Sequence, residues 1–193
     1  MYFCRKYLVM NKKLIILLVL FLCSVVNSSG ESVCHNMLIN ILYTISNEPQ
    51  ASDYYKKGLK LYQAGKQKEC LVCMIKAIEL WDKEIDANAT AGDACMLVGR
   101  IYFNNKQFVE AQKYADKALD IVTEIYDMDN SIECAKAYRF LGETYFMQDK
   151  YDDAYMNFAA AYEIAKNLLG EKHKEVKQIE LLLTASYSKM TGK

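Results

Sequence analysis

The chain is poor in the residues that turns, β-sheets and metal sites require. Its 193 residues include one proline, Pro49, and only eight glycines, which leaves few turn-forming residues for an all-β fold. The two histidines, His35 and His173, lie far apart and lack the spacing of a zinc site. No serine, histidine and aspartate set stands in a distinctive context. We therefore expect no enzyme activity, no catalytic residues, no metal site and no cofactor.

A strong excess of charge of either sign is also missing. The 24 basic and 24 acidic residues balance, but Arg5, Lys6, Lys12 and Lys13 all lie within residues 1–30, where no acidic residue occurs. The remaining 163 residues therefore carry 20 basic and 24 acidic side chains. A mildly acidic body lacks the basic surface that nucleic-acid binding needs, so we exclude nucleic acid as a partner.

What the chain does contain favours helices and a packed core. Apolar residues make up 52% of the sequence and charged residues 25%, a composition typical of folded domains. Leucine, alanine, lysine, glutamate and methionine are plentiful, and all of them favour the α-helix. We predict an all-α fold.

The first 30 residues have the three parts of a secretory signal. Lys12 and Lys13 precede an apolar run over residues 14–23, and small and polar residues follow over 24–30. The unbroken apolar run has ten residues, whereas a helix that spans a membrane needs about 20. We expect an exported protein in a secreted, periplasmic or secretory-pathway location, with a membrane anchor as the alternative if the segment is not cleaved.

Residues 31–50 are predicted to form a capping helix and a turn. Apolar residues recur there at helical spacing and end before Pro49. They are Val33, Met37, Leu38, Ile41, Leu42 and Ile45. We expect this helix to cover the apolar face of the segment that follows it, and a flexible stalk is the alternative.

The body of the chain, residues 51–193, repeats one pattern around the anchors Gly58, Gly99 and Gly142. The first block comprises Tyr54, Lys57, Gly58, Leu61, Cys70, Met74 and Ala77. The second comprises Cys95, Val98, Gly99, Tyr102, Ala111, Ala115 and Ala118. The third comprises Tyr138, Leu141, Gly142, Tyr145, Ala154, Phe158 and Ala161. A shortened fourth copy has Leu183, Thr184 and Tyr187, so the anchors at 58, 99, 142 and 184 lie 41, 43 and 42 residues apart.

These blocks resemble the W-x2-L-G-x2-Y…A-x3-F pattern of the tetratricopeptide repeat. The long spacing, and the segment over residues 169–176, resemble the kinesin-light-chain type of this repeat, although that type usually has proline where Lys174 stands. The resemblance implies a right-handed superhelical array of antiparallel helix pairs, an α-solenoid, with three repeats and a partial fourth over residues 51–193. At least about three stacked repeats are needed for such an array to bury its core.

The pattern also predicts how the helices pack. Small residues at the three glycine anchors, and at Ala111 and Ala154, are expected to let the two helices of a hairpin approach closely, with tyrosines filling the space between. Gly65 is expected to supply the bend of the first hairpin, because glycine adopts a left-handed backbone without strain.

The exported body would hold five cysteines, of which Cys70 and Cys73 form a C-x-x-C pair inside a predicted helix. Core packing is our main interpretation of this pair. Because an oxidising compartment favours pairing, we also predict one disulfide that joins Cys70 or Cys73 to Cys95 or Cys34. A thiol-based redox or metal-binding protein using Cys70, Cys73 and Cys95 remains an alternative function.

The resemblance implies that the first helices of the repeats line a concave groove and present a ladder of peptide-binding side chains. In this register the ladder comprises Tyr55, Leu59, Tyr62, Met96, Arg100, Phe103, Asn104, Lys136, Arg139, Glu143, Phe146 and Met147. Arg100, Lys136 and Arg139 form a basic centre suited to a carboxylate. We therefore expect a scaffold or adaptor that binds a protein or an extended peptide with acidic and apolar residues.

Two further interpretations stay open. In the first, Phe103 and Phe146 pack internally and the basic side chains are merely solvated. A third class of function is a self-associating structural unit, a homo-oligomer joined through the C-terminal face, because residues 187–193 show no clear capping helix. A chaperone tail is not expected as the ligand, since Tyr55 and Leu59 stand where chaperone-binding repeats need lysine and asparagine.

Overall fold

The structure is a computed structural model that describes residues 49–84, 88–126 and 131–192. These residues form seven α-helices and no β-strand, which confirms the all-α prediction. The helices are α3 (Ala51–Gln63), α4 (Gln67–Trp81), α5 (Ala89–Asn104), α6 (Phe108–Ile125), α7 (Ile132–Phe146), α8 (Tyr151–Leu169) and α9 (Lys174–Thr191). None of these seven helices is both long and apolar enough to cross a membrane. The predicted signal segment and capping helix, with Cys34 and His35, fall on residues 1–48, outside the described residues.

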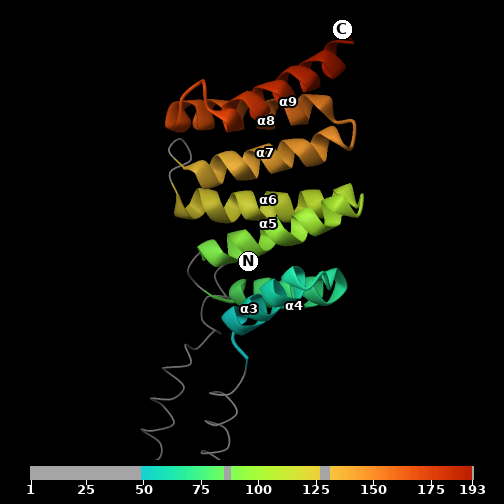
Figure 1. Cartoon of the computed structure of the whole chain (residues 1–193), viewed down its shortest axis with the longest axis vertical. Coiled ribbons are helices and arrows are strands. Elements are labelled where there is room, and N and C mark those ends of the chain that lie inside the picture. Colours follow the sequence, from blue (N-terminus) through green and yellow to red (C-terminus); the bar gives the residue numbers. More distant parts are fainter. Residues whose placement is uncertain (1–48, 85–87, 127–130, 193) are drawn as a thin grey trace, which may run out of the picture. The chain divides into compact units, whose positions relative to one another are not determined.

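Residues 51–193 form one compact unit in which the helices pair in chain order. The pairs α3–α4, α5–α6 and α7–α8 are antiparallel hairpins, and α9 packs on α8 as the first helix of a fourth pair (Figure 1). The first helices of the pairs are thus α3, α5, α7 and α9, and the second helices are α4, α6 and α8. The repeats found in the sequence correspond to these pairs.

The turn inside each hairpin has the same backbone geometry. Gly65, Lys106 and Asp149 each lie seven residues after a glycine anchor and have φ values of 74°, 61° and 58°. The structure therefore confirms that Gly65 makes the first bend. The other two hairpins force a residue with a Cβ atom into a left-handed conformation that glycine adopts more readily.

The first helices α5, α7 and α9 begin with side-chain caps, which the second helices α4, α6 and α8 lack. The Asn88 side chain accepts a hydrogen bond from Thr90 N at 2.9 Å at the start of α5. Ser131 accepts one from Cys134 N at 3.4 Å at the start of α7. Such caps satisfy amide groups that have no partner inside the helix. Each of these two loops between pairs thus ends at a capping residue, and the next first helix begins directly after it.

The glycine anchors mark the closest helix approaches. A Cβ atom on Gly58 would lie 2.8 Å from Met74 Cε, and one on Gly142 would lie 2.7 Å from Phe158. In both cases the partner comes from the second helix of the same hairpin, as predicted. At Gly99 the tightest neighbour is instead Phe140, at 2.7 Å, from the first helix of the next pair. Gly99 therefore sets the approach between α5 and α7, which the hairpin interpretation missed.

The α9 helix presents its outer side to solvent. Leu181 is 72% exposed and Tyr187 is 50% exposed, while Val176 and Ile179 are buried on the inner side of α9. Thr184 occupies the position that glycine anchors hold in the three earlier first helices. A threonine Cβ there obstructs the close packing of a large side chain that Gly142 allows.

Candidate functional site

The twelve ladder residues lie on α3, α5 and α7, with Met147 directly after α7, and none of them is fully buried. We call these residues together the ladder face. Their register is regular: Met96 and Arg139 are 43 residues apart, as are Arg100 and Glu143. Because 43 residues is also the spacing of the repeat, the two members of each pair occupy the same position on neighbouring first helices. We call side chains that share a position in successive repeats a row of the ladder face.

The centre of the ladder face is an ion-paired triad of Arg100, Glu143 and Arg139. Arg100 Nη1 donates a hydrogen bond to Glu143 Oε2 across the two helices α5 and α7. Arg139 Nε donates to the other carboxylate oxygen, Oε1, at 3.0 Å within α7. The Glu143 side chain is only 14% exposed, whereas Arg100 is 38% and Arg139 30% exposed. The triad keeps one net positive charge, half of what the two arginines would carry alone.

Aromatic side chains pack against one member of this triad, Arg100, and against one another. The Arg100 guanidinium lies 4.1 Å from the centre of the Phe140 ring, a cation–π contact. Phe103 meets both Phe108 and Phe140 edge to face, and Phe146 meets Tyr151 in the same way. Phe103 and Phe146 are thus half-buried and partly used for internal packing, although each keeps some exposed surface.

Next to the triad, towards the start of the helices, lies a smaller group of mixed charge. Lys136 Nζ approaches Glu133 Oε1 at 4.0 Å. Burial raises the pKa of the Asp93 carboxyl above its ordinary value, the nearby Glu133 raises it further, and Lys136 lowers it. Lys136 is therefore paired with Glu133 and is not a free cation. The predicted basic centre divides into the triad and this group.

The α3 end of the ladder face is apolar. Tyr55 packs edge to face on Trp81 with ring centres 5.7 Å apart, and Leu59 lies against the same core cluster. Burial raises the pKa of the Tyr55 phenol, and Asp93 raises it further. Tyr62 is 42% exposed and Asn104 on α5 is also exposed. This end offers aromatic surface with few charges.

The predicted ladder ends at α7, but the repeat spacing continues onto α9. The observed repeat spacing of 42 residues carries Arg139 to Leu181 and Glu143 to Ala185, both exposed on α9. The sequence already indicated this continuation, because the fourth anchor, Thr184, predicts a further first helix at the position of α9. The register thus continues the ladder on α9 with apolar side chains.

The four described cysteines are buried, and no two of them form a disulfide. The predicted disulfide between Cys70 or Cys73 and Cys95 is therefore wrong; its alternative partner, Cys34, lies outside the described residues. Burial raises the pKa of the Cys70 thiol, with Cys73 adding to the effect. Burial also raises the pKa of Cys95 to about 12. Thiolates form poorly under these conditions, so the geometry suits packing and not redox chemistry.

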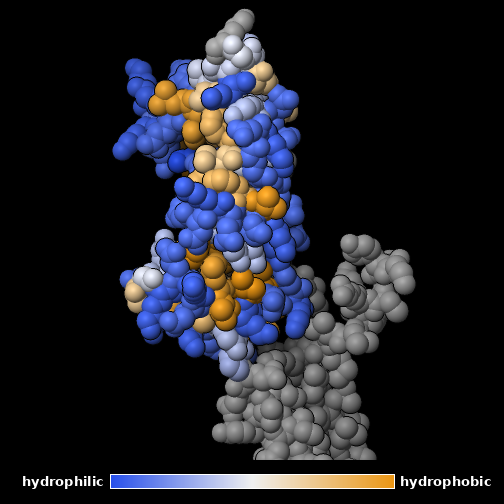
Figure 2. Space-filling model, turned by 90° about the vertical axis from the view of Figure 1, so that its right-hand side faces the viewer, coloured by the Kyte–Doolittle hydropathy of each residue, from blue (hydrophilic) through white to orange (hydrophobic). Residues whose placement is uncertain are grey.

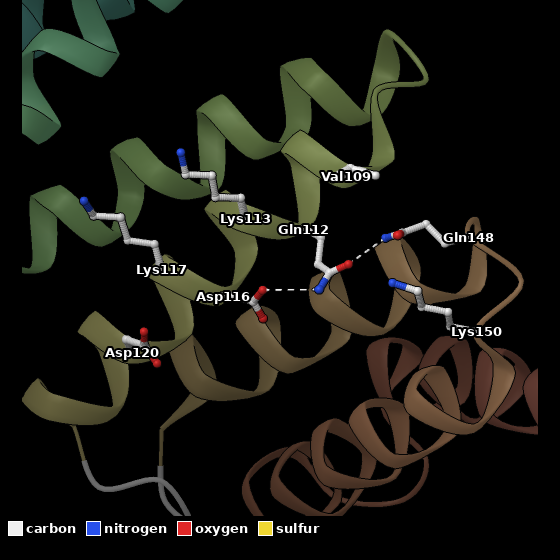
Figure 3. A pocket seen from close by; sticks show the side chains of 8 residues that line it. All are labelled: Val109, Gln112, Lys113, Asp116, Lys117, Asp120, Gln148 and Lys150. Carbon is white, nitrogen blue, oxygen red and sulfur yellow. Dashed lines mark hydrogen bonds between the residues drawn. The ribbon is translucent and has the colours of Figure 1, made fainter.

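Within the described ranges, no three side chains of histidine, cysteine, aspartate and glutamate come together as a metal site. A pocket of about 560 Å³, lined by none of the ladder residues, lies between α6 and the turn into α8 (Figure 3). It is lined by Val109, Gln112, Lys113, Asp116, Lys117, Asp120, Gln148 and Lys150.

Three polar side chains of this pocket, those of Gln112, Asp116 and Gln148, are linked to one another by hydrogen bonds. Gln148 donates to Gln112 Oε1 at 2.9 Å, while Gln112 donates to Asp116 at 3.4 Å and to Tyr145 Oη at 3.2 Å. Lys113 and Lys117 point away from this network in Figure 3. The pocket therefore lacks a set of converging free groups, and the ladder face is the better candidate site.

Exposed apolar side chains also occur outside the ladder face. One side of the array shows apolar patches interrupted by polar residues (Figure 2). Val72, Val109 and Met156, on the second helices α4, α6 and α8, are each about 70% exposed. Single exposed apolar residues are common on protein surfaces and mark no site by themselves.

Models of the tetratricopeptide repeat match residues 92–154 and 134–175. Among solved structures, BtubC (BKLC) from P. vanneervenii is similar with a TM-score of 0.65 and 16% identity, over 93% of this chain and 74% of that one. The nearly identical TPR-like repeats of a putative kinesin light chain from Podosopora anserina give 0.61 and 14%, over 75% and 69%.

The first TPR of Spaghetti (RPAP3), bound to the HSP90 peptide SRMEEVD, gives a TM-score of 0.50 and 21% identity, over 70% of this chain and 94% of that one. At these identities the similarity concerns the fold alone. No curated protein matches the sequence.

Proposed function

We propose that this tetratricopeptide-repeat chain is a binding scaffold that recognises a peptide or protein segment on its ladder face. The array of helix pairs is a fold typical of protein-interaction scaffolds. Such arrays bind along surfaces built from many repeats, with each repeat supplying a few side chains. The regular rows on α3, α5 and α7 have this property.

One observation carries the proposal: the two arginines of the triad stay partly exposed and keep unused hydrogen-bond donors. Apart from the bonds to Glu143, neither guanidinium has another hydrogen bond among the described residues. Planar guanidinium groups bind carboxylates well. With Tyr62 and Met147 exposed at other rows, the ladder face suits a segment that combines acidic and apolar residues.

The relative bound to the HSP90 peptide SRMEEVD illustrates how a similar fold holds an acidic segment. The side chains differ here, because Tyr55 and Leu59 provide no cation at the positions that a chaperone tail requires. We therefore propose a ligand other than a chaperone tail. The charge that attracts it comes from α5 and α7, one pair further along the array.

We also propose that the protein acts after export. The support is the order of basic, apolar and small residues over 1–30. The ligand would then belong to the same exported compartment or to the surface of a membrane facing it. Membrane attachment of the scaffold itself would require retention of the N-terminal segment.

A capture experiment from the native exported fraction tests the function. The full chain is used as bait beside an Arg100→Glu/Arg139→Glu variant, and a Lys68→Glu/Lys113→Glu variant provides a matched change of charge on exposed second-helix positions. Circular dichroism and thermal unfolding establish that all three baits are folded. We expect a protein that binds the wild type and the lysine variant but not the arginine variant. Equal retention by all three baits would contradict the proposal.

A further inference from the structure

We propose that Glu143 restricts the ladder face to ligands that present one carboxylate at the arginine pair, and selects against acidic clusters. This inference rests on the function proposed above and makes it more specific. It assigns the choice of ligand to a residue that sequence reasoning placed in the ladder without a role of its own.

The first argument is the number of donors that the triad leaves available. A guanidinium has five N–H donors. Arg139 uses Nε for Glu143 and keeps both terminal nitrogens, while Arg100 uses one N–H of Nη1 and keeps Nε and Nη2. With 38% and 30% of these side chains exposed, a ligand carboxylate can reach the remaining donors.

The second argument is charge. Two guanidinium groups and one carboxylate leave a single positive charge at the centre of the ladder face. One ligand carboxylate neutralises that charge. A second, adjacent ligand carboxylate would find no further uncompensated cation within the triad and would be repelled by Glu143 at short range.

The third argument is that Glu143 is held in place. Both of its oxygens accept hydrogen bonds, and its side chain is 14% exposed. Arg100, one of its two partners, lies on the ring of Phe140, which is fully buried. A ligand would have to break both ion pairs to move the Glu143 carboxylate aside, so the carboxylate remains part of the site.

The rows beside the triad define the rest of the ligand. Arg139 shares its row with Tyr55 and Met96 on one side and, at the repeat spacing, with Leu181 on the other. Leu181 is 72% exposed. The expected ligand is therefore a segment with one central acidic residue and apolar residues before and after it.

A displayed random peptide library, selected against the full chain, tests the inference. Wild type, Glu143→Gln and the charge-conserving Glu143→Asp are selected in parallel, and enriched peptides are counter-screened on Arg100→Glu/Arg139→Glu. We expect wild type and Glu143→Asp to enrich peptides with one acidic residue between apolar ones, and Glu143→Gln to enrich adjacent acidic pairs. For matched synthetic peptides with Asp-Leu or Asp-Asp at the centre, the preference should change by about tenfold or more.

The outcomes separate this inference from the function on which it rests. If arginine-dependent peptides are enriched but have the same number of acidic residues on wild type and Glu143→Gln, the inference is wrong and the proposed function stands. Enrichment of acidic pairs by the wild type also overturns it. If no enriched peptide depends on the arginines, the proposed function fails together with the inference.

Discussion

Phe140 fills the space that Gly99 leaves on the neighbouring first helix. A Cβ atom on Gly99 would lie 2.7 Å from Phe140 Cε1 and 3.2 Å from Cζ. Arg100, the residue after Gly99, lies over the same Phe140 ring and reaches Glu143 from there. The glycine thus connects the packing of α5 on α7 to the position of the arginine in the ladder face.

Gly99→Ala is expected to destabilise the protein by about 1–3 kcal/mol, because the added methyl group forces the buried Phe140 ring or the helices apart. Gly92→Ala on the same helix is the matched control. A Cβ there would meet Val122 at 3.4 Å, an ordinary contact, and alanine favours the helix by about 0.5–1 kcal/mol. Urea denaturation measures both. Equal stabilities of the two variants would contradict the packing described here.

Lys106→Gly is expected to stabilise the protein by up to about 1 kcal/mol, although it removes a side chain. Lys106 has φ 61° at the hairpin turn, a conformation that is strained for lysine and free for glycine. Gly65→Ala, at the same position of the first hairpin with φ 74°, should destabilise by a similar amount. Thermal unfolding measures the change in stability of each variant. If both variants change the stability in the same direction, the two turns are not equivalent.

Cys95 should make the stability depend on pH in the alkaline range. Burial raises the pKa of its thiol to about 12, whereas an unfolded cysteine titrates near ~8.5. Below the unfolded pKa both states are protonated and the thiol has no effect on the pH dependence. Between about pH 9 and 12 the unfolded state loses its proton first, so the free energy of unfolding falls by up to about 1.4 kcal/mol per pH unit.

The comparison with Cys95→Ala isolates this effect. The variant is less stable at neutral pH because it leaves a small cavity, but its stability should fall less steeply above pH 9. Urea denaturation at several pH values gives the two slopes. If both slopes are the same, Cys95 is not the buried thiol described here.

The repeat pattern predicted most of the fold because it is periodic and local. A glycine anchor, a turn seven residues later and small residues at fixed offsets describe one hairpin, and each hairpin is a short segment of chain. The partner of Gly99 was missed for a physical reason. Its neighbour Phe140 lies on the next pair, so the contact depends on how hairpins stack and not on the periodicity within one hairpin.

The site was predicted only as a set of residues. Arg100, Arg139 and Glu143 were all identified from the register, yet their ion pairing was not, although the separation of 43 residues between Arg100 and Glu143 equals the repeat spacing. The predicted pairing of Cys70 or Cys73 with Cys95 failed because neighbouring helices do not fix how their cysteines face each other. A disulfide needs Cβ atoms roughly 3.5–4.5 Å apart, and helix adjacency alone does not supply that geometry.

The most direct test of the ladder face is photo-crosslinking at single positions in the native exported fraction. A benzophenone amino acid replaces exposed Tyr62, Met147 or Leu181 on the ladder rows, and Val72 or Val109 on second helices as controls. Our account predicts that the three ladder positions form a covalent adduct with one common protein and that the two control positions do not. Adducts formed only from Val72 and Val109 would place binding on the second helices and contradict the central claim.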